Sequence, residues 1–207
     1  MHSRKAIGSH SSRRLPAAKA QSIATNERPS EQEIVIAYPR PWEAEYRQRG
    51  FVTKWIDQFA EMYKRSASSE RFPQLSTRLQ TLDLFPQYAL MYLLRQKGFQ
   101  SLTWYKLANL NMKSKNWQRT EAHWREMRNW MGEDKFKRLQ EAISPALPLF
   151  KGEPDLFCWN ADSGAWFFAE VKHRDNLTAS ELDWFRICRE TLGPSVDLRV
   201  YRLRASD

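Results

Sequence analysis

The chain has few cysteines and no long apolar run. Two of its 207 residues are cysteine, Cys158 and Cys188, and neither stands at metal-ligand spacing from the other or from a nearby histidine. This excludes a disulfide framework and a cysteine-based zinc site, so we expect both thiols to be reduced and packed, as in an intracellular protein. Because no segment approaches about eighteen consecutive apolar residues, a transmembrane helix is not supported, and we expect a soluble protein.

Acidic residues are also in the minority. Lys and Arg total 33 against 24 Asp and Glu, which gives a formal net charge of +9 and a pI near 9.7. Such a surplus favours polyanionic partners such as nucleic acid, although charge alone does not separate DNA from RNA or from an anionic membrane. The length suits one sizeable domain with a tail.

The tail is residues 1–30, which are rich in Ser, Arg, Lys and Ala and have Glu27 as their only acid. Because it lacks apolar periodicity, it is predicted to be a disordered basic arm that contacts phosphates loosely. An acid-poor start rich in Arg and Ser also resembles an organelle transit peptide, but the disordered arm is the more economical interpretation. We expect residues 31–207 to form a single domain, of which 31–143 is mainly helical.

Periodicity outlines the elements of that helical part. Residues 34–36 form a short apolar run bounded by prolines, which predicts an edge strand or an extended segment. Apolar residues at helical spacing and capping signals predict three helices, and an apolar stretch between two of them predicts a strand. The predicted helices cover residues 42–64, 84–97 and 119–143, the last interrupted at Gly132, and the strand covers 99–108.

The remaining part, residues 144–207, begins with a predicted β-hairpin. Two runs rich in aromatic and apolar residues, 156–159 and 165–171, flank the turn-forming sequence Asn-Ala-Asp-Ser-Gly. A helix over 179–192, stopped by Gly-Pro, and an alternating strand over 196–200 are expected to follow.

The hairpin is expected to bring three charged side chains together. Successive residues of a strand alternate between its faces, so Glu170 and Lys172 share one face while Val171 points to the core. Asp155 stands directly before the first strand, after the rigid Pro154, and the hairpin can place its carboxylate beside Glu170. Charges on an exposed strand face are ordinary, but this strand is apolar almost throughout, and an acid buried in it needs a partner.

Paired carboxylates indicate a divalent cation. Two carboxylates held close repel each other unless a cation neutralises them, and Mg²⁺ or Mn²⁺ suits hard oxygen ligands. The expected ligands are Asp155, Glu170 and the backbone carbonyl of Val171. Lys172 is expected to orient the attacking water or to stabilise charge on a phosphoryl oxygen. The pattern therefore indicates metal-assisted hydrolysis of a phosphodiester.

The order of these motifs carries a family resemblance. G-x-P-D-L, the hairpin, E-V-K and then D-x-L-T-x-x-E-x-x-W-F, over roughly the last sixty residues, resemble the VRR-NUC family of the PD-(D/E)XK nucleases. The resemblance implies an α/β fold of the restriction-endonuclease-like class, with helices flanking a mixed sheet and additional N-terminal helices. It also implies that Asp155 and Glu170 bind the metal and that Lys172 is catalytic.

The same resemblance implies a substrate and a setting. Flap, branched or junction DNA would be cut, in the cytoplasm, at a bacterial nucleoid or in the host of a phage. A homodimer is an expectation, because two-fold DNA symmetry asks for a two-fold protein. The alternative is a non-catalytic module on the same scaffold that binds nucleic acid or a partner nuclease, and RNA cleavage is a third interpretation.

Two positions depart from the family pattern. A glutamine is common in the helix after E-V-K, but this chain has Glu181, which the sequence from Thr178 favours as part of a helix capping box over a further metal contact. The acid expected on an upstream helix is replaced by Gln87, whose amide oxygen can coordinate but adds no charge, which favours one metal ion. Four other acids are candidate substitutes that the sequence does not rank: Glu43, Glu45, Glu121 and Glu126.

Cations and aromatic rings interleave between Trp104 and Trp130, as in proteins that bind single-stranded or branched nucleic acid. Core packing explains the tryptophans at least as well, and Trp124 is expected to face a core. His173 is expected to point away from Glu170 and to make a hydrogen bond or a phosphate contact. The candidate nucleic-acid contacts are Lys113, Lys115, Arg119, Lys151, His173 and Arg174.

Overall fold

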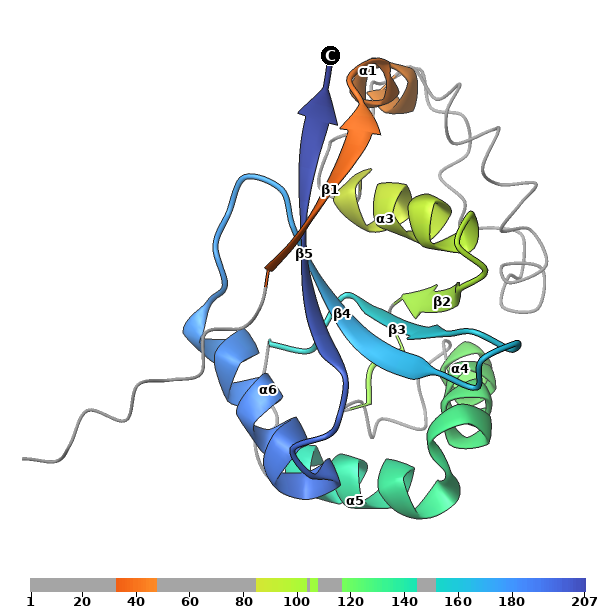
Figure 1. Cartoon of the computed structure of the whole chain (residues 1–207). Coiled ribbons are helices and arrows are strands. Elements are labelled where there is room, and N and C mark those ends of the chain that lie inside the picture. The colour runs from red at the N-terminus through yellow and green to blue at the C-terminus, as the bar shows by residue number, and fades with distance from the viewer. Residues whose placement is uncertain (1–32, 48–84, 104, 108–116, 145–151) are drawn as a thin grey trace, which may run out of the picture. The chain divides into compact units, whose positions relative to one another are not determined.

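A five-stranded mixed sheet organises the fold in a computed structural model that describes residues 33–47, 85–103, 105–107, 117–144 and 152–207 (Figure 1). The strands are β1 (Glu33–Pro39), β2 (Gln100–Thr103), β3 (Leu156–Trp159), β4 (Trp166–Lys172) and β5 (Leu198–Ser206). The helices of the described residues are α1 (Pro41–Arg47), α3 (Phe85–Arg95), α4 (Trp117–Met131), α5 (Glu133–Ile143) and α6 (Ala179–Leu192).

The sheet order is β1-β5-β4-β3-β2, so the predicted hairpin lies inside the sheet. β3 and β4 are antiparallel with Leu156 opposite Ala169, whereas β5 runs parallel to β4 after the α6 crossover. Six of the seven β4 residues are buried, because helices cover both faces of this strand. The structure thus confirms the α/β class, the mixed sheet and the hairpin.

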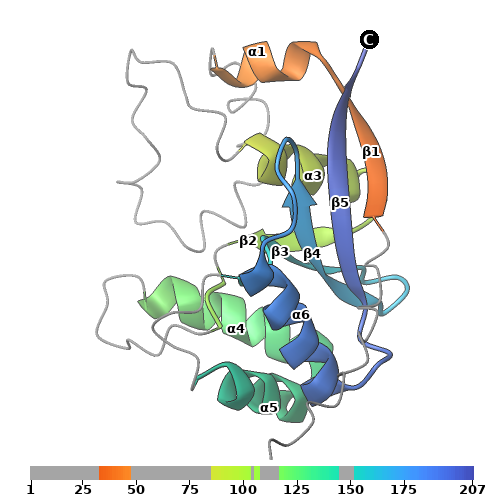
Figure 2. The same cartoon turned by 90° about the vertical axis from the view of Figure 1, so that its left-hand side faces the viewer.

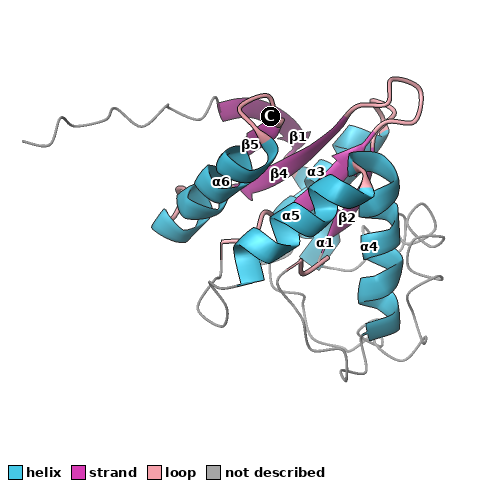
Figure 3. Cartoon of the chain, turned by 90° about the horizontal axis from the view of Figure 1, so that it is seen from below, coloured by secondary structure: helices cyan, strands magenta, loops and turns pink. Residues whose placement is uncertain are grey.

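Two apolar cores lie on opposite faces of the sheet. One core joins α1 and α3 to residues such as Ala169 and Val171, and the other joins α4, α5 and α6 to residues such as Phe168. Figures 2 and 3 show α6, α5 and α4 on one side of the strands and α3 on the other. Val171 therefore faces the core opposite to the Glu170 side, as predicted.

Glycines mark the helix boundaries that the sequence predicts. Gly98, directly after the turn that ends α3, has φ of 81°, and Gly132, between α4 and α5, has φ of 88°. Both values lie in the region that residues with a Cβ rarely occupy. The expected helix at 84–97 and the interrupted helix at 119–143 are confirmed with small shifts of their ends, and the edge strand at 34–36 is confirmed as β1.

Three expectations differ from the structure or fall outside it. The final strand begins at Leu198 and continues to Ser206, beyond the expected end at residue 200, because β5 pairs with β1 as far as Pro39 and Ser206. The strand expected at 99–108 is described only as β2. Of the helix expected at 42–64 the structure describes α1, and residues 48–84 lie outside the described residues, as does the basic arm 1–30.

The division of the chain into an arm and a single domain over 31–207 stays a prediction. None of the described helices has the length and apolar character needed to cross a membrane.

Candidate active site

Asp155 lies at the open end of the hairpin, one residue before β3. Because Leu156 pairs with Ala169, the next residues outward, Asp155 and Glu170, stand across from each other. Asp155 Oδ2 accepts a hydrogen bond from the Val171 backbone N–H at 3.0 Å, and its Oδ1 accepts one from Gln87 Nε2. The predicted meeting of residues 155 and 170 is consistent with this register.

The segment before Asp155 is fixed by two neighbours. At Gly152 an added Cβ would stand 2.0 Å from the carbonyl oxygen of Ser180, so only glycine allows this close approach to the first turn of α6. The Glu153 carboxylate accepts the Leu107 N–H at 2.6 Å, and the Tyr105 hydroxyl donates to the Pro154 carbonyl at 2.8 Å. These contacts hold Asp155 in place without using its carboxylate.

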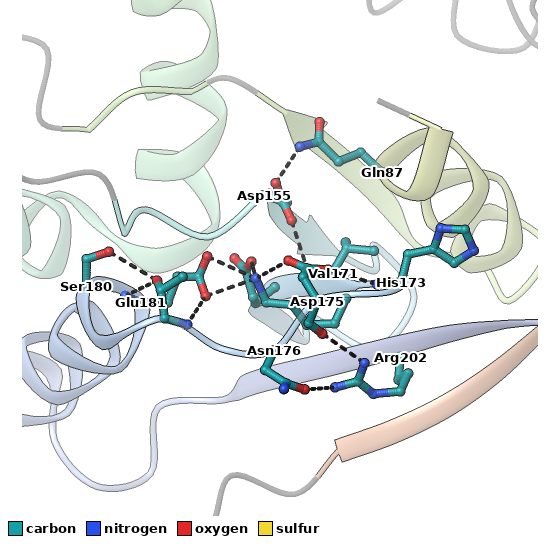
Figure 4. Close-up of polar contacts among 12 residues, drawn as sticks. Gln87, Asp155, Val171, His173, Asp175, Asn176, Ser180, Glu181 and Arg202 are labelled. Carbon is teal, nitrogen blue, oxygen red and sulfur yellow. Dashed lines mark hydrogen bonds and ion pairs between the residues drawn. The ribbon is translucent and has the colours of Figure 1, made fainter. Parts of the chain in front are cut away.

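Lys172 is the most enclosed charge of the site, with 2% of its surface exposed. Its ammonium Nζ lies 2.8 Å from Glu170 Oε1, 3.0 and 2.9 Å from the two oxygens of Glu181, and 3.2 Å from Asp175 Oδ2. Figure 4 shows Glu181 at the start of α6 and Asp175 on the connection between β4 and α6, with Asp155 and Gln87 on the other side of the group. Glu170 and Lys172 thus share one face of β4, as predicted.

Burial controls the ionisation of these groups. It raises the pKa of Glu170 well above its usual range, and the nearby negative charge of Asp155 raises it further. Burial likewise raises the pKa of Asp155, against the lowering effect of the Val171 N–H. For Lys172 burial alone lowers the pKa, but the bonds to Glu170 and then to Glu181 raise it overall above its ordinary value, so the amine stays charged.

Glu181 has two roles at once. Its backbone N–H donates to the Thr178 hydroxyl at 3.4 Å and its carboxylate accepts the Thr178 N–H at 2.8 Å, which confirms the predicted capping box at the start of α6. The contact of the same carboxylate with Lys172 was missed by the sequence argument, as was that of Asp175. The signal was available, because an acid three residues after a lysine, beyond a strand end, can turn back onto it.

Gln87 stands beside Asp155, as the resemblance implied for the upstream position. It lies in the first turns of α3, donates to Asp155 through Nε2, and accepts a hydrogen bond from the Thr103 hydroxyl at 3.3 Å. In this arrangement its amide nitrogen, and not its oxygen, faces the carboxylate.

The four acids that could replace the upstream carboxylate lie on α1 and α4. Glu43 of α1 accepts a hydrogen bond from Tyr38 and pairs with Arg174 at 3.4 Å, and Glu121 of α4 pairs with Arg128 at 2.5 Å. These partners hold both acids in other networks. Glu45 lies on α1 and Glu126 on α4, and their roles stay predictions.

His173 and Arg174 lie just outside the site. His173 Nε2 is 2.7 Å from the Tyr38 hydroxyl, which is the neighbouring hydrogen bond that the sequence allowed. Burial lowers its pKa. Arg174, with a side chain 72% exposed, extends towards solvent.

The other nucleic-acid candidates stay predictions. Lys113, Lys115 and Lys151 lie outside the described residues, and of Arg119 only the helical backbone is described. Trp124 is 5% exposed and packs edge-on against Phe136, as expected for a core residue.

Comparison with known proteins finds a similarity to a solved structure only at the level of the fold. No family model and no curated protein sequence matches the chain. Among solved structures the chain is similar to paFAN1 in a crystal structure with DNA that has a 2-nucleotide 5′ flap and a gap, at 14% identity and a TM-score of 0.39. The likeness covers 80% of this chain and 44% of that chain, so this chain spans less than half of paFAN1's length there. It is weak, and the functional proposal depends on the side chains described above.

The carboxylates fit one hard divalent cation. Within the described ranges no group of three or more His, Cys, Asp or Glu side chains is arranged to hold a metal ion. Asp155 and Glu170 provide two carboxylates, and Mg²⁺ typically takes only one or two from a protein and completes its shell with water and substrate oxygens. The charge of Asp155 acts on buried Glu170, a repulsion that a cation between them would relieve.

Proposed function

We propose that this protein hydrolyses DNA phosphodiester bonds with Mg²⁺ or Mn²⁺ held by Asp155 and Glu170. The observation that carries the proposal is the buried Lys172 ammonium beside buried Glu170, with the half-buried Asp155 at the same end of the hairpin. Burying an acid costs free energy unless it is paired, and a buried and a half-buried acid beside one lysine exceed what a structural ion pair needs. Clusters of this kind occur preferentially at functional sites.

Each side chain has a defined role in the proposal. A bound divalent cation would supply charge neutralisation and activation of water. Asp155 and Glu170 bind through oxygen, and the Val171 carbonyl is a third candidate donor. The Val171 N–H and Gln87 orient Asp155. Lys172 supplies a fixed positive charge beside Glu170, which would act electrostatically on the negative charge that develops on the phosphoryl oxygens in the transition state.

The proposed substrate is flap, branched or junction DNA. The net charge of +9 favours a polyanion, and the family resemblance of the motifs favours flap, branched or junction DNA over plain duplex. The exposed Arg174, directly after the site, is suited to a phosphate contact.

The test is a cleavage assay with purified full-length protein. Labelled flap, junction, duplex and single-stranded DNA, together with RNA, are incubated in Mg²⁺ and in Mn²⁺. Wild type should cut at least one DNA, whereas Asp155→Ala and Lys172→Ala should lose at least about a hundredfold in rate while DNA binding is largely kept. Cleavage that persists in both variants would mean that the site is assigned to the wrong residues.

A second candidate function rests on Gln87. It places an uncharged amide beside Asp155 where the family resemblance implies an acid, and the missing charge fits a scaffold that binds nucleic acid or a partner without cutting. The control is Gln87→Glu, because it restores the acid that the family pattern places there. If wild type is inactive and this variant cuts, the non-catalytic function is favoured.

A further inference from the structure

The Lys172 ammonium is shared among several carboxylates. An ammonium has three N–H donors, and here three carboxylates surround it: Glu170, Glu181 and Asp175. Glu170 is therefore engaged by Lys172, although the proposed function requires it to bind a cation. If Lys172 had no other partner, a cation at Glu170 would leave a buried positive charge poorly compensated.

Glu181 and Asp175 differ as alternative partners. The Glu181 side chain is 14% exposed and contacts Nζ with both oxygens, whereas Asp175 is 64% exposed and farther from it. Water screens the exposed pair, so Glu181 provides the stronger share of the compensation.

Both acceptors are held by the fold and not by Lys172 alone. The capping box fixes Glu181 to the start of α6. Arg202 of β5 donates through Nη1 to the Asp175 carbonyl at 2.9 Å and through Nη2 to Asn176 at 3.4 Å, so it fixes the loop that carries Asp175 (Figure 4). The carboxylates are thus in place before any ligand binds, as preorganisation requires.

Resting on the proposed function, we infer that Glu181, assisted by Asp175, is a positioning residue that holds the Lys172 ammonium and thereby leaves Glu170 available to a divalent cation. Glu181 is not itself a metal ligand in this arrangement. Removing its charge would leave Lys172 more dependent on Glu170, so Lys172 and the cation would compete for the same carboxylate. Cation affinity should fall although no ligand has been changed.

Titration of full-length protein with Mn²⁺ by calorimetry tests this inference. Glu181→Gln keeps a capping side chain at the third helical position, and it should weaken Mn²⁺ binding about tenfold. Asp183→Asn and Glu190→Gln make the same charge change at exposed positions of α6, and they should weaken it less than about twofold. Thr178→Ala removes the hydroxyl that accepts the Glu181 N–H but keeps the backbone N–H that holds the Glu181 carboxylate, so it should leave Mn²⁺ affinity unchanged.

A variant without Lys172 distinguishes the positioning role of Glu181 from a non-specific effect of removing a negative charge near the cation. In Lys172→Met the added Glu181→Gln should weaken Mn²⁺ binding by less than about twofold, because the competitor is gone. If Lys172→Met does not fold, the comparison of Glu181→Gln with Asp183→Asn decides alone. Equal losses in those two variants, or no loss in either, would overturn the inference.

The two proposals fail in different ways. Cleavage by wild type with unchanged Mn²⁺ affinity in Glu181→Gln overturns the positioning role and leaves the nuclease. A selective loss of Mn²⁺ affinity in Glu181→Gln, with no nucleic acid cut by wild type, leaves the positioning role and removes the nuclease.

Discussion

The two ends of the β3–β4 hairpin are built differently. At the closed end Asn160 Oδ1 accepts the N–H groups of Asp162 and Ser163, both at 2.9 Å, and the Asn160 N–H donates to the Ala165 carbonyl at 2.9 Å. Every partner lies within six consecutive residues. The turn is exposed, so these hydrogen bonds bury little charge or polarity.

The open end depends on distant segments and buries charge. Asp155 is held by α3 and β4, and Lys172 by acids from β4, the following loop and α6. Polar groups out of water cost free energy unless their partners are well placed. We conclude that the closed end and its aromatic packing stabilise the fold. The enclosed charges of the open end cost free energy of folding, and they form the preorganised site of the proposal.

The largest effect on stability is expected from Trp159→Ala, at the closed end of β3. Trp159 is 5% exposed and stacks on Trp130 with ring centroids 6.1 Å apart. Its removal leaves a cavity and should lower the free energy of unfolding by about 3–5 kcal/mol. Denaturant unfolding measures the loss, and cleavage per folded molecule at low temperature should be unchanged. A variant that stays stable but stops cutting would contradict the division between the two ends.

The next effect is expected from Gly152→Ala at the open end. The new Cβ would lie 2.0 Å from the backbone carbonyl oxygen of Ser180. No side-chain rotation can relieve this clash, so the segment before Asp155 must move away from α6. Overpacking of this kind costs about 1–3 kcal/mol. Cleavage should fall by more than the loss of folded protein explains, because Asp155 moves with the segment. Gly164→Ala, in the turn at the closed end, is the matched glycine control.

The pH dependence of stability should distinguish the ends further. Burial is the main reason that the folded-state pKa of Asp155 is raised to about 6 from its ordinary value of 3.8. Its contribution to stability is therefore complete below the unfolded pKa and is lost as the pH rises through the folded pKa. Without metal, stability should fall by about 2 kcal/mol from this group between about pH 4 and pH 7.

Chemical unfolding at several pH values with a chelator present measures this slope. Asp155→Asn should make it shallower, although part of the slope should remain because the pKa of Glu170 is also raised by burial, and Mn²⁺ should restore stability at the higher pH values. Trp159→Ala should lower the whole curve without changing the slope. An equal slope in wild type and Asp155→Asn would show that Asp155 is not strained by burial.

The features that the sequence predicts are those that depend on neighbouring residues, and the features that it misses depend on distant segments. The hairpin, the helix at 179–192 and the breaks at Gly98 and Gly132 depend on short-range signals, namely periodicity, turn residues and caps, and the structure confirms them. The extension of the last strand to Ser206 depends on a partner strand that lies more than a hundred residues earlier. Local alternation cannot carry that information.

The site shows the same limit more sharply. The alternation of β4 was enough to place Glu170 and Lys172 on one face, and Pro-Asp before β3 was enough to suggest Asp155. The orientation of the Gln87 amide and the reach of Glu181 to Lys172 depend on how α3 and α6 pack against the sheet. A helix cap and an ammonium acceptor require the same residue type, so the simpler role concealed the second one.

The smallest effect is expected from Gly164→Ala in the exposed turn. Gly164 has φ of 69°, where residues with a Cβ are strained, but its Cβ would meet nothing within 4 Å. The cost is thus conformational alone, about 1 kcal/mol in the free energy of unfolding. Because the turn is held by its own hydrogen bonds, cleavage and Mn²⁺ affinity should match wild type. If this small change at the closed end weakened Mn²⁺ binding, the strands would couple the two ends, and the site would depend on the whole hairpin instead of on the segments that meet at Asp155.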